Sequence, residues 1–120
     1  MVKILVVEDT PAQMDLIKLY LNEGGYTVFT ANNAKDGLSM LDKEKPDVVI
    51  TDVVMEGMNG FEMCRAIKKN PETEKVPVIA CTSRNTDLDR MWGMKQGVDA
   101  YIGKPFTSEE LIRAVRSVAG

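Results

Sequence analysis

Five short apolar runs, each rich in β-branched residues, alternate along the chain with five amphipathic stretches. The runs are Lys3–Val7, Thr27–Thr30, Asp47–Thr51, Pro77–Cys81 and Ala100–Ile102. Three of them are apolar without interruption, which is typical of strands buried on both faces of a parallel sheet. The alternation predicts an α/β fold with a doubly wound, five-stranded parallel sheet and five helices. Chains of this length commonly adopt the flavodoxin-like strand order 2-1-3-4-5, which we therefore expect.

The stretches between the runs carry signals for the start and the end of a helix. Asp9 or Thr10 can cap the first helix, with Pro11 at its first position, and Gly24-Gly25 ends it. The last helix opens with the segment Thr107–Glu110, which reads as a capping box. No linker, repeat or low-complexity segment interrupts the pattern, so we expect one domain over residues 1–120.

Apolar residues recur at helical spacing in the fourth amphipathic stretch. They are Leu88, Met91 and Met94. We expect this stripe to face the core, and we expect the methionines here and those at Met55 and Met58 to fill gaps in it. Trp92 lies off the stripe, and the sequence leaves open whether it packs at a helix edge or anchors a partner.

The chain contains no histidine, which removes several classes of function. A Ser-His-Asp triad, a histidine-ligated metal site and an imidazole proton shuttle are all excluded. The net charge of −3 argues against direct binding of nucleic acid. Cys64 and Cys81 stand far apart in apolar stretches, so we expect both to be buried and reduced. With no basic leader and no apolar run near the ~20 residues of a membrane span, we expect a cytoplasmic protein without membrane insertion.

Polar residues stand where four of the expected strands end. They are Glu8-Asp9, Asp52, Thr82-Ser83 and Lys104-Pro105. In the expected strand order these loops converge at one crevice. Each residue alone could be a helix cap, a turn residue or a solvated charge, but three carboxylates in one crevice repel each other unless a cation offsets them. Oxygen ligands without imidazole or thiolate favour Mg²⁺, so the set predicts a small acidic Mg²⁺ site with one nucleophilic carboxylate.

The same residues resemble those of a known family. The matching positions are Glu8-Asp9, Asp52, Met55, Gly60, Thr82 and Lys104-Pro105-Phe106. At this spacing, over the whole chain, they resemble the receiver domains of two-component response regulators. The stretch 91–97 is similar to that of stand-alone regulators of twitching motility and type IV pili. The resemblance implies one receiver domain over residues 1–120, without an output domain, that controls a partner such as a motility or pilus machine.

The resemblance also implies a mechanism. The residue matching Asp52 accepts a phosphoryl group from a sensor histidine kinase or a histidine phosphotransfer protein. The implied Mg²⁺ ligands are Glu8, Asp9, Asp52 and the backbone carbonyl of Val54. Lys104 and Thr82 would each contact a phosphoryl oxygen, because phosphoryl transfer depends on positioning and on cancellation of charge. The bond between Lys104 and Pro105 is usually cis in receivers.

The implied output is a conformational switch. In the family, the hydroxyl matching Thr82 moves toward the phosphoryl group and an aromatic matching Tyr101 rotates into the vacated space. The surface of the fourth helix, fifth strand and fifth helix then changes, which alters binding of a downstream protein target. Val54 and Arg84 occupy positions that tune self-dephosphorylation, and valine, which cannot orient a water, predicts a long-lived phosphoryl group. Glu56 replaces a proline that is common in receivers.

We expect a monomer or weak dimer that is no enzyme beyond Mg²⁺-dependent self-phosphorylation and self-dephosphorylation. Three alternatives stay open at this point. A phosphatase of the haloacid-dehalogenase type would need an aspartate where Val54 stands. A flavin carrier would need a glycine-rich phosphate loop where Glu8-Asp9 stands. A receiver that only docks, without phosphorylation, is disfavoured by the intact acidic site.

Overall fold

Five parallel strands form one sheet in a computed structural model of the chain, which describes residues 1–119. The strands are β1 (Lys3–Val7), β2 (Thr27–Ala31), β3 (Val48–Thr51), β4 (Val78–Thr82) and β5 (Ala100–Gly103). The sheet order is β2-β1-β3-β4-β5, as the sequence predicts, with Leu5 in register with both Phe29 and Val49. Several strand ends differ by one residue from the expected runs; Thr82, in particular, closes β4 instead of following it.

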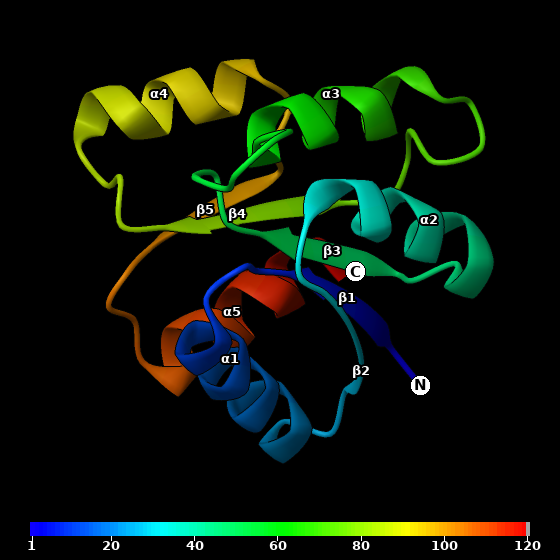
Figure 1. The fold of residues 1–120 in the computed structure, drawn as a ribbon. Helices are drawn as coiled ribbons and strands as arrows, with labels where there is room; N and C mark the ends of the chain where they lie inside the picture. The colour runs from blue at the N-terminus through cyan, green and yellow to red at the C-terminus, as the bar shows by residue number, and fades with distance from the viewer. Residues whose placement is uncertain (120) are drawn as a thin grey trace.

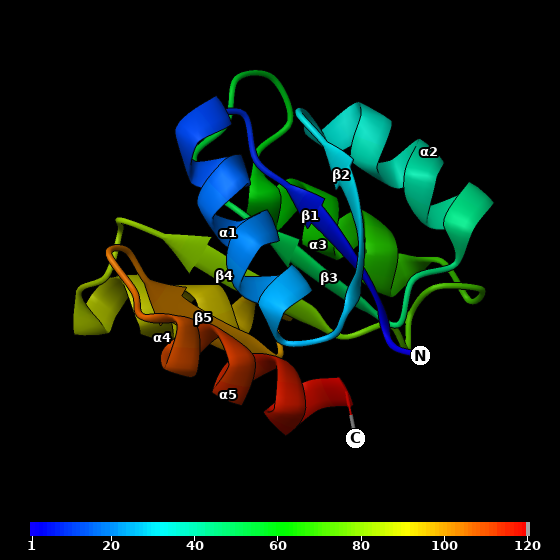
Figure 2. The same cartoon turned by 90° about the horizontal axis from the view of Figure 1, so that it is seen from below.

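Five helices cover the two faces of the sheet. They are α1 (Pro11–Glu23), α2 (Ala34–Glu44), α3 (Gly60–Lys69), α4 (Asp87–Lys95) and α5 (Ser108–Ala119). Figures 1 and 2 show α1 and α5 on one face, and α2, α3 and α4 on the other. The predicted doubly wound architecture is therefore confirmed. No described helix has the length and apolar character needed to cross a membrane.

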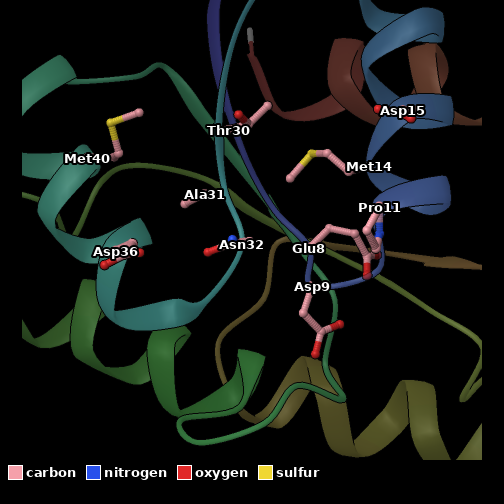
Figure 3. Close-up of a pocket in the computed structure, with 10 residues that line it drawn as sticks. All are labelled: Glu8, Asp9, Pro11, Met14, Asp15, Thr30, Ala31, Asn32, Asp36 and Met40. Carbon is pink, nitrogen blue, oxygen red and sulfur yellow. The ribbon is translucent and has the colours of Figure 1, made fainter.

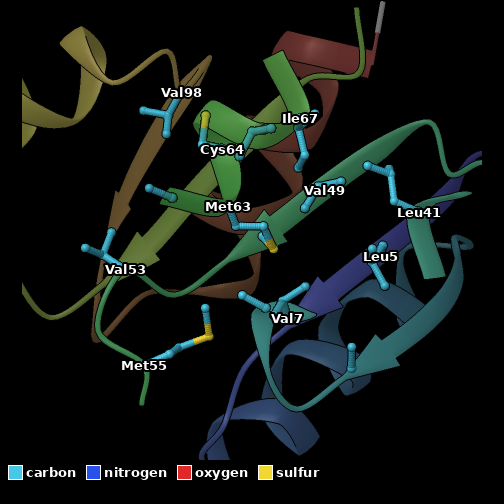
Figure 4. Close-up of a cluster of buried hydrophobic side chains, with 14 residues drawn as sticks. Leu5, Val7, Leu41, Val49, Val53, Met55, Met63, Cys64, Ile67 and Val98 are labelled. Atoms are coloured by element: carbon cyan, nitrogen blue, oxygen red, sulfur yellow. The ribbon is translucent and has the colours of Figure 1, made fainter. Parts of the chain in front are cut away.

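The core consists of two clusters, one on each face of the sheet. On β1, Leu5 and Val7 point to the cluster beneath α2 and α3, and Ile4 and Val6 point to the cluster beneath α1 and α5. Figure 4 shows the first cluster, in which Met63 from α3 meets the strand residues. The uninterrupted apolar runs are thus buried on both faces, which holds the strand ends in fixed positions.

Side-chain caps set the starts of four helices. Asn33 caps α2, Asn59 forms a capping box with Glu62 at α3, and Thr107 binds Glu110 at α5. At α4 the box joins Thr86 and Asp89, and these hydrogen bonds hold the pKa of the Asp89 carboxyl below its usual value. For α1 the expected side-chain cap is not formed: the Thr10 side chain makes no capping bond, and Pro11 starts the helix.

The expected orientation of α4 is wrong. Leu88, Met91 and Met94 are exposed to solvent instead of facing the core. Of the α4 residues only Gly93 is buried. It packs so closely on Tyr101 that an added Cβ would lie 2.6 and 2.8 Å from two atoms of the ring.

Of the loop methionines, Met55 is buried as expected, but the same expectation for Met58 is wrong, because Met58 is exposed.

Helical spacing predicted the apolar stripe on α4, but the close packing of the opposite side of the helix against β5 decides which way the stripe faces.

Both cysteines are buried and unpaired, as expected. Burial raises the pKa of the Cys64 thiol to about 11 and that of Cys81 to about 12, so neither forms an appreciable thiolate near neutral pH. Both side chains belong to the apolar clusters. The interpretation of the two cysteines as small buried hydrophobes is confirmed.

Candidate functional site

The carboxyl ends of β1 and β3 bring three carboxylates together. Glu8 and Asp9 follow β1, and Asp52 follows β3, its neighbour in the sheet. One carboxylate oxygen from each of the three lies within 4.8 Å of the other two. Glu8 is buried, Asp52 is half-buried and Asp9 is exposed. Because hard divalent cations prefer such oxygen ligands, the set fits a cation at the crevice that the sequence predicts.

Lys104, at the end of β5, supplies a positive charge between two of these carboxylates. Its Nζ lies 2.6 Å from Glu8 Oε1 and 3.3 Å from Asp52 Oδ2. Burial of the ammonium works against its charge, but the hydrogen bond that it donates to Glu8 and the charges of Asp52 and Glu8 outweigh this effect and raise the Lys104 pKa above its ordinary value. The lysine therefore stays protonated near neutral pH. Its peptide bond to Pro105 is cis, as the resemblance implied.

The backbone after β3 fixes the orientation of Asp52. The Val54 N–H donates to Asp52 Oδ1 at 3.2 Å, which leaves Oδ2 for Lys104. The hydroxyl of Thr51 donates to the carbonyl of Asp52 at 2.8 Å. A Cβ at Gly60 would collide with that same carbonyl, so the start of α3 can press against this loop only because residue 60 is glycine. The motif glycine thus packs against the backbone of Asp52.

The loop after β4 is held from two sides at Arg84. The backbone N–H of Arg84 donates to Thr82 Oγ1 at 3.2 Å, and the hydroxyl of Tyr101 donates to the carbonyl of Arg84. Arg90 from α4 lies 5.4 Å from the centre of the Tyr101 ring and donates to the Tyr101 carbonyl at 3.1 Å. Burial, followed by the charge of Asp89, raises the pKa of Tyr101. The two side chains of the expected switch therefore bind the same residue.

Two cavities flank the carboxylates. One of about 440 Å³ opens beside Asp52 and Lys104, with Thr10, Gln13 and Ser83 in its wall. The other, of about 560 Å³, opens beside Glu8 and Asp9 between α1, β2 and α2. Figure 3 shows the second cavity, whose wall also holds Asp15, Asp36, Met14 and Met40. The carboxylate cluster is accordingly open to solutes on two sides.

Of the sequence-predicted site residues, four meet at this crevice: Glu8, Asp9, Asp52 and Lys104. Glu56 is exposed and does not belong to the group of carboxylates that meet within the described residues. Sequence reasoning missed the hydrogen bond from the Thr51 hydroxyl to the Asp52 carbonyl. It also missed the packing of Asn85 on Gly103, where a Cβ on residue 103 would collide with the asparagine side chain. A hydroxyl directly before the predicted acceptor was a usable signal for Thr51. The Asn85 contact joins two loops and left no pattern in the sequence.

Comparison with known proteins places these features in a family. A family model described as "Response regulator receiver domain" matches residues 4–116. Protein PilH of Pseudomonas aeruginosa is 39% identical over 118 residues, which are 98% of each chain. Chemotaxis protein CheY4 of Vibrio cholerae has a TM-score of 0.91 and 29% identity, over 98% of both chains.

A third similar structure is the receiver domain of sensor histidine kinase PA1611 from Pseudomonas aeruginosa, whose active site cleft holds a coordinated magnesium ion. It has a TM-score of 0.90 and 27% identity, over 98% of this chain and 97% of that one.

Proposed function

Because the chain belongs to the receiver-domain family of response regulators, we propose that Asp52 accepts a phosphoryl group from a phosphohistidine of a sensor histidine kinase or a histidine phosphotransfer protein. The observation that carries this proposal is the setting of the Asp52 carboxylate. Oδ1 accepts the Val54 N–H at 3.2 Å, and Oδ2 lies 3.3 Å from the Lys104 ammonium. The chain has no histidine of its own, so the donor imidazole belongs to the partner.

In the transfer, a carboxylate oxygen of Asp52 attacks phosphorus and the P–N bond to the partner's imidazole breaks. The electron pair of that bond returns to the ring nitrogen. Lys104 is close enough to Asp52 to bind an oxygen of the phosphoryl group once it is attached, and Thr82 would bind another. The protein thus acts mainly through positioning and charge.

Glu8, Asp9 and Asp52 would hold a divalent cation, Mg²⁺, together with the backbone carbonyl of Val54. The support is the meeting of three carboxylate oxygens within 4.8 Å, without imidazole or thiolate ligands. When bound, Mg²⁺ supplies positive charge to the phosphoryl oxygens. The PA1611 receiver, with magnesium in its active site cleft, supports the same assignment.

The output would be a change at the surface of α4, β5 and α5 that controls a downstream protein target. Thr82 and Tyr101 both bind Arg84, so a shift of the Thr82 hydroxyl toward the phosphoryl group would release one of the two bonds on this loop. We place the target in a motility or pilus machine, which the name of chemotaxis protein CheY4 supports. The unpaired cysteines fit a cytoplasmic protein.

Beyond its own phosphorylation and dephosphorylation the chain would catalyse no reaction. The exposed Val54 stands two residues after the acceptor and cannot orient a water, so the phosphoryl group would be long-lived. A Val54→Asn variant should lose the phosphoryl group faster than the parent in Mg²⁺ buffer. Equal or slower loss in the variant would remove this part of the proposal.

The proposal is tested by incubating the protein with acetyl phosphate and Mg²⁺ and measuring its intact mass. We expect one added phosphoryl group, removed by hydroxylamine, and no adduct in EDTA. Asp52→Asn should give no adduct, whereas Asp36→Asn, a change of an exposed aspartate outside the three-carboxylate group, should react like the parent. An adduct on Asp52→Asn, or none on the parent, would refute the assignment of Asp52.

A further inference from the structure

Thr51 is a buried polar residue to which the proposed phosphoryl transfer assigns no role. Within the described chain, the side chains that are both buried and polar or charged belong to Glu8, Thr51 and Thr82. Glu8 and Thr82 take part in the proposed mechanism. Thr51 ends β3, directly before Asp52, and is 1% exposed. A buried hydroxyl costs free energy unless it forms a hydrogen bond, so its bonding partner indicates its purpose.

The surroundings of Thr51 are apolar and suit a valine. Successive side chains of a strand point to opposite faces of the sheet, so Thr51 shares a face with Val49. Its neighbours across the sheet are Val7 on β1 and Ala80 on β4. Val7, Val49 and Ala80 belong to one apolar core cluster, part of which Figure 4 shows. Valine and threonine branch alike at Cβ, with a methyl group in place of the hydroxyl, so packing alone does not require threonine here.

The Thr51 hydroxyl holds the backbone of Asp52. It donates to the Asp52 carbonyl at 2.8 Å, and no backbone N–H of the described residues donates to that carbonyl. A Cβ at Gly60 would collide with the carbonyl oxygen, so the start of α3 closes in on it from another side. The Asp52 N–H donates to the Val7 carbonyl at 3.1 Å. The two hydrogen bonds lie on either side of the Asp52 Cα, and together they restrict both of its backbone dihedral angles.

We infer that Thr51 is a positioning residue for phosphoryl transfer, because its hydroxyl fixes the backbone that aims the Asp52 carboxylate. This role rests on the proposed function of Asp52 as the phosphoryl acceptor. The direction of the Asp52 side chain follows from its backbone angles, and the same backbone leads to the Val54 N–H that donates to Oδ1 at 3.2 Å. A reacting group that is misplaced by a fraction of an ångström reacts more slowly, since transfer depends on alignment. Thr51 therefore acts on the reaction through Asp52, without contact with the donor.

Phosphorylation kinetics test this role in the intact protein. With acetyl phosphate and Mg²⁺, followed by intact mass, Thr51→Val should lower the maximal rate of adduct formation about tenfold. The acetyl phosphate concentration that gives half of the maximal rate should stay the same, because the buried side chain does not reach the donor. Thr51→Ser retains the hydroxyl and should react within about twofold of the parent. Thr51→Ala, a second variant without the hydroxyl, should react as slowly as Thr51→Val.

Thr73→Val provides the matched control. The Thr73 hydroxyl also donates to a backbone carbonyl, that of Ile67, at 2.7 Å. This bond lies at the other end of α3 from Gly60. The variant loses a hydrogen bond of the same kind outside the carboxylate site, so its maximal rate should equal that of the parent.

A second readout needs no phosphoryl donor. When the Asp52 carboxylate loses its orientation, the Val54 N–H loses its acceptor. Exchange of the Val54 amide proton with water, measured by NMR, should therefore become about threefold faster in Thr51→Val. In Thr51→Ser and Thr73→Val this proton should exchange at the parent rate. Faster exchange along the whole of β3 would instead indicate that Thr51 only stabilises the strand.

Three results would overturn the positioning role of Thr51. They are a Thr51→Val variant that reacts as fast as a reactive parent, a Val54 amide that exchanges at the parent rate in that variant, and a Thr73→Val variant that is slowed to the same extent. Failure of the proposed function gives a different result. A parent that forms no adduct refutes Asp52 as the acceptor, and the Val54 amide then decides by itself whether Thr51 orients the carboxylate.

Discussion

Replacing Lys104 with methionine should strongly destabilise the protein in the absence of metal. The Lys104 ammonium lies 2.6 Å from Glu8 Oε1, and the Glu8 side chain is 1% exposed, so its carboxylate has little access to water. Removing one partner of a buried ion pair costs about 3–5 kcal/mol, because the other charge is left uncompensated. The side chains of Lys104 and Asp52 are 11% and 12% exposed, which favours the lower end of that range.

The magnitude converts directly into a melting temperature. The unfolding entropy of a domain of 120 residues is about 0.25 kcal/mol/K, so a loss of about 3 kcal/mol lowers the Tm by about 12 °C. The assay is thermal unfolding followed by circular dichroism in EDTA, where no divalent cation can replace the lysine charge. Adding Glu8→Gln to Lys104→Met removes both charges and should recover at least half of the loss.

Lys68→Met provides the matched control. Lys68 Nζ forms an ion pair with Asp99 at 2.8 Å, but these side chains are 25% and 39% exposed. An exposed pair of this kind contributes about 1 kcal/mol or less, so the Tm should fall by about 4 °C at most. If Lys104→Met melts as close to the parent as Lys68→Met does, burial of the Glu8–Lys104 pair is not the source of stability that we describe.

Three further predictions concern helix α4 and the lysine charge. Gly93→Ala should lower stability by about 1–2 kcal/mol in denaturant unfolding, although alanine favours helices, because its Cβ would meet the Tyr101 ring; a more stable variant would contradict this packing. Thr86→Ala should lower the free energy of unfolding by about 1 kcal/mol, because it removes the hydroxyl that accepts the Asp89 N–H, and Thr86→Ser should keep most of that stabilisation. The stabilisation from Lys104 is fully present below its unfolded pKa of 10.5 and is lost as the pH rises through its higher folded pKa, so parent and Lys104→Met should converge only in strong alkali.

The sequence determined most of the fold because its signals are local. Uninterrupted apolar runs predict buried parallel strands, and parallel strands bring their carboxyl ends to one edge, so the proximity of Asp9 and Asp52 was predictable without coordinates. The presence of Lys104 at the same crevice was predicted as well, but its ion pairs with Glu8 and Asp52 were not, since they depend on the path of the loop after β5. The sequence argument assigned Lys104 to a phosphoryl oxygen and the offset of the carboxylate repulsion to a metal, so it missed the charge that Lys104 itself supplies to Glu8 and Asp52.

Helix α4 shows what helical spacing alone cannot predict. Helical spacing shows that Leu88 and Met91 share a face, but it does not state whether the face meets the core or water. That choice depended on Gly93, whose lack of a side chain lets the other face approach Tyr101. Similarly, Thr10 has the residue type of a helix cap, yet its side chain makes no capping bond. Residue type limits what a position can do, and packing decides which option is used.

The two bonds that hold Arg84 have a consequence for how this protein can diverge. Thr82 and Tyr101 bind the backbone N–H and the backbone carbonyl of Arg84, so neither bond uses its guanidinium. The side chain at position 84 is 63% exposed. Substitutions there can accordingly change the exposed side chain while the backbone link from the loop after β4 to Tyr101 persists. Position 84 can therefore vary in sequence without loss of the contact between the loop after β4 and strand β5.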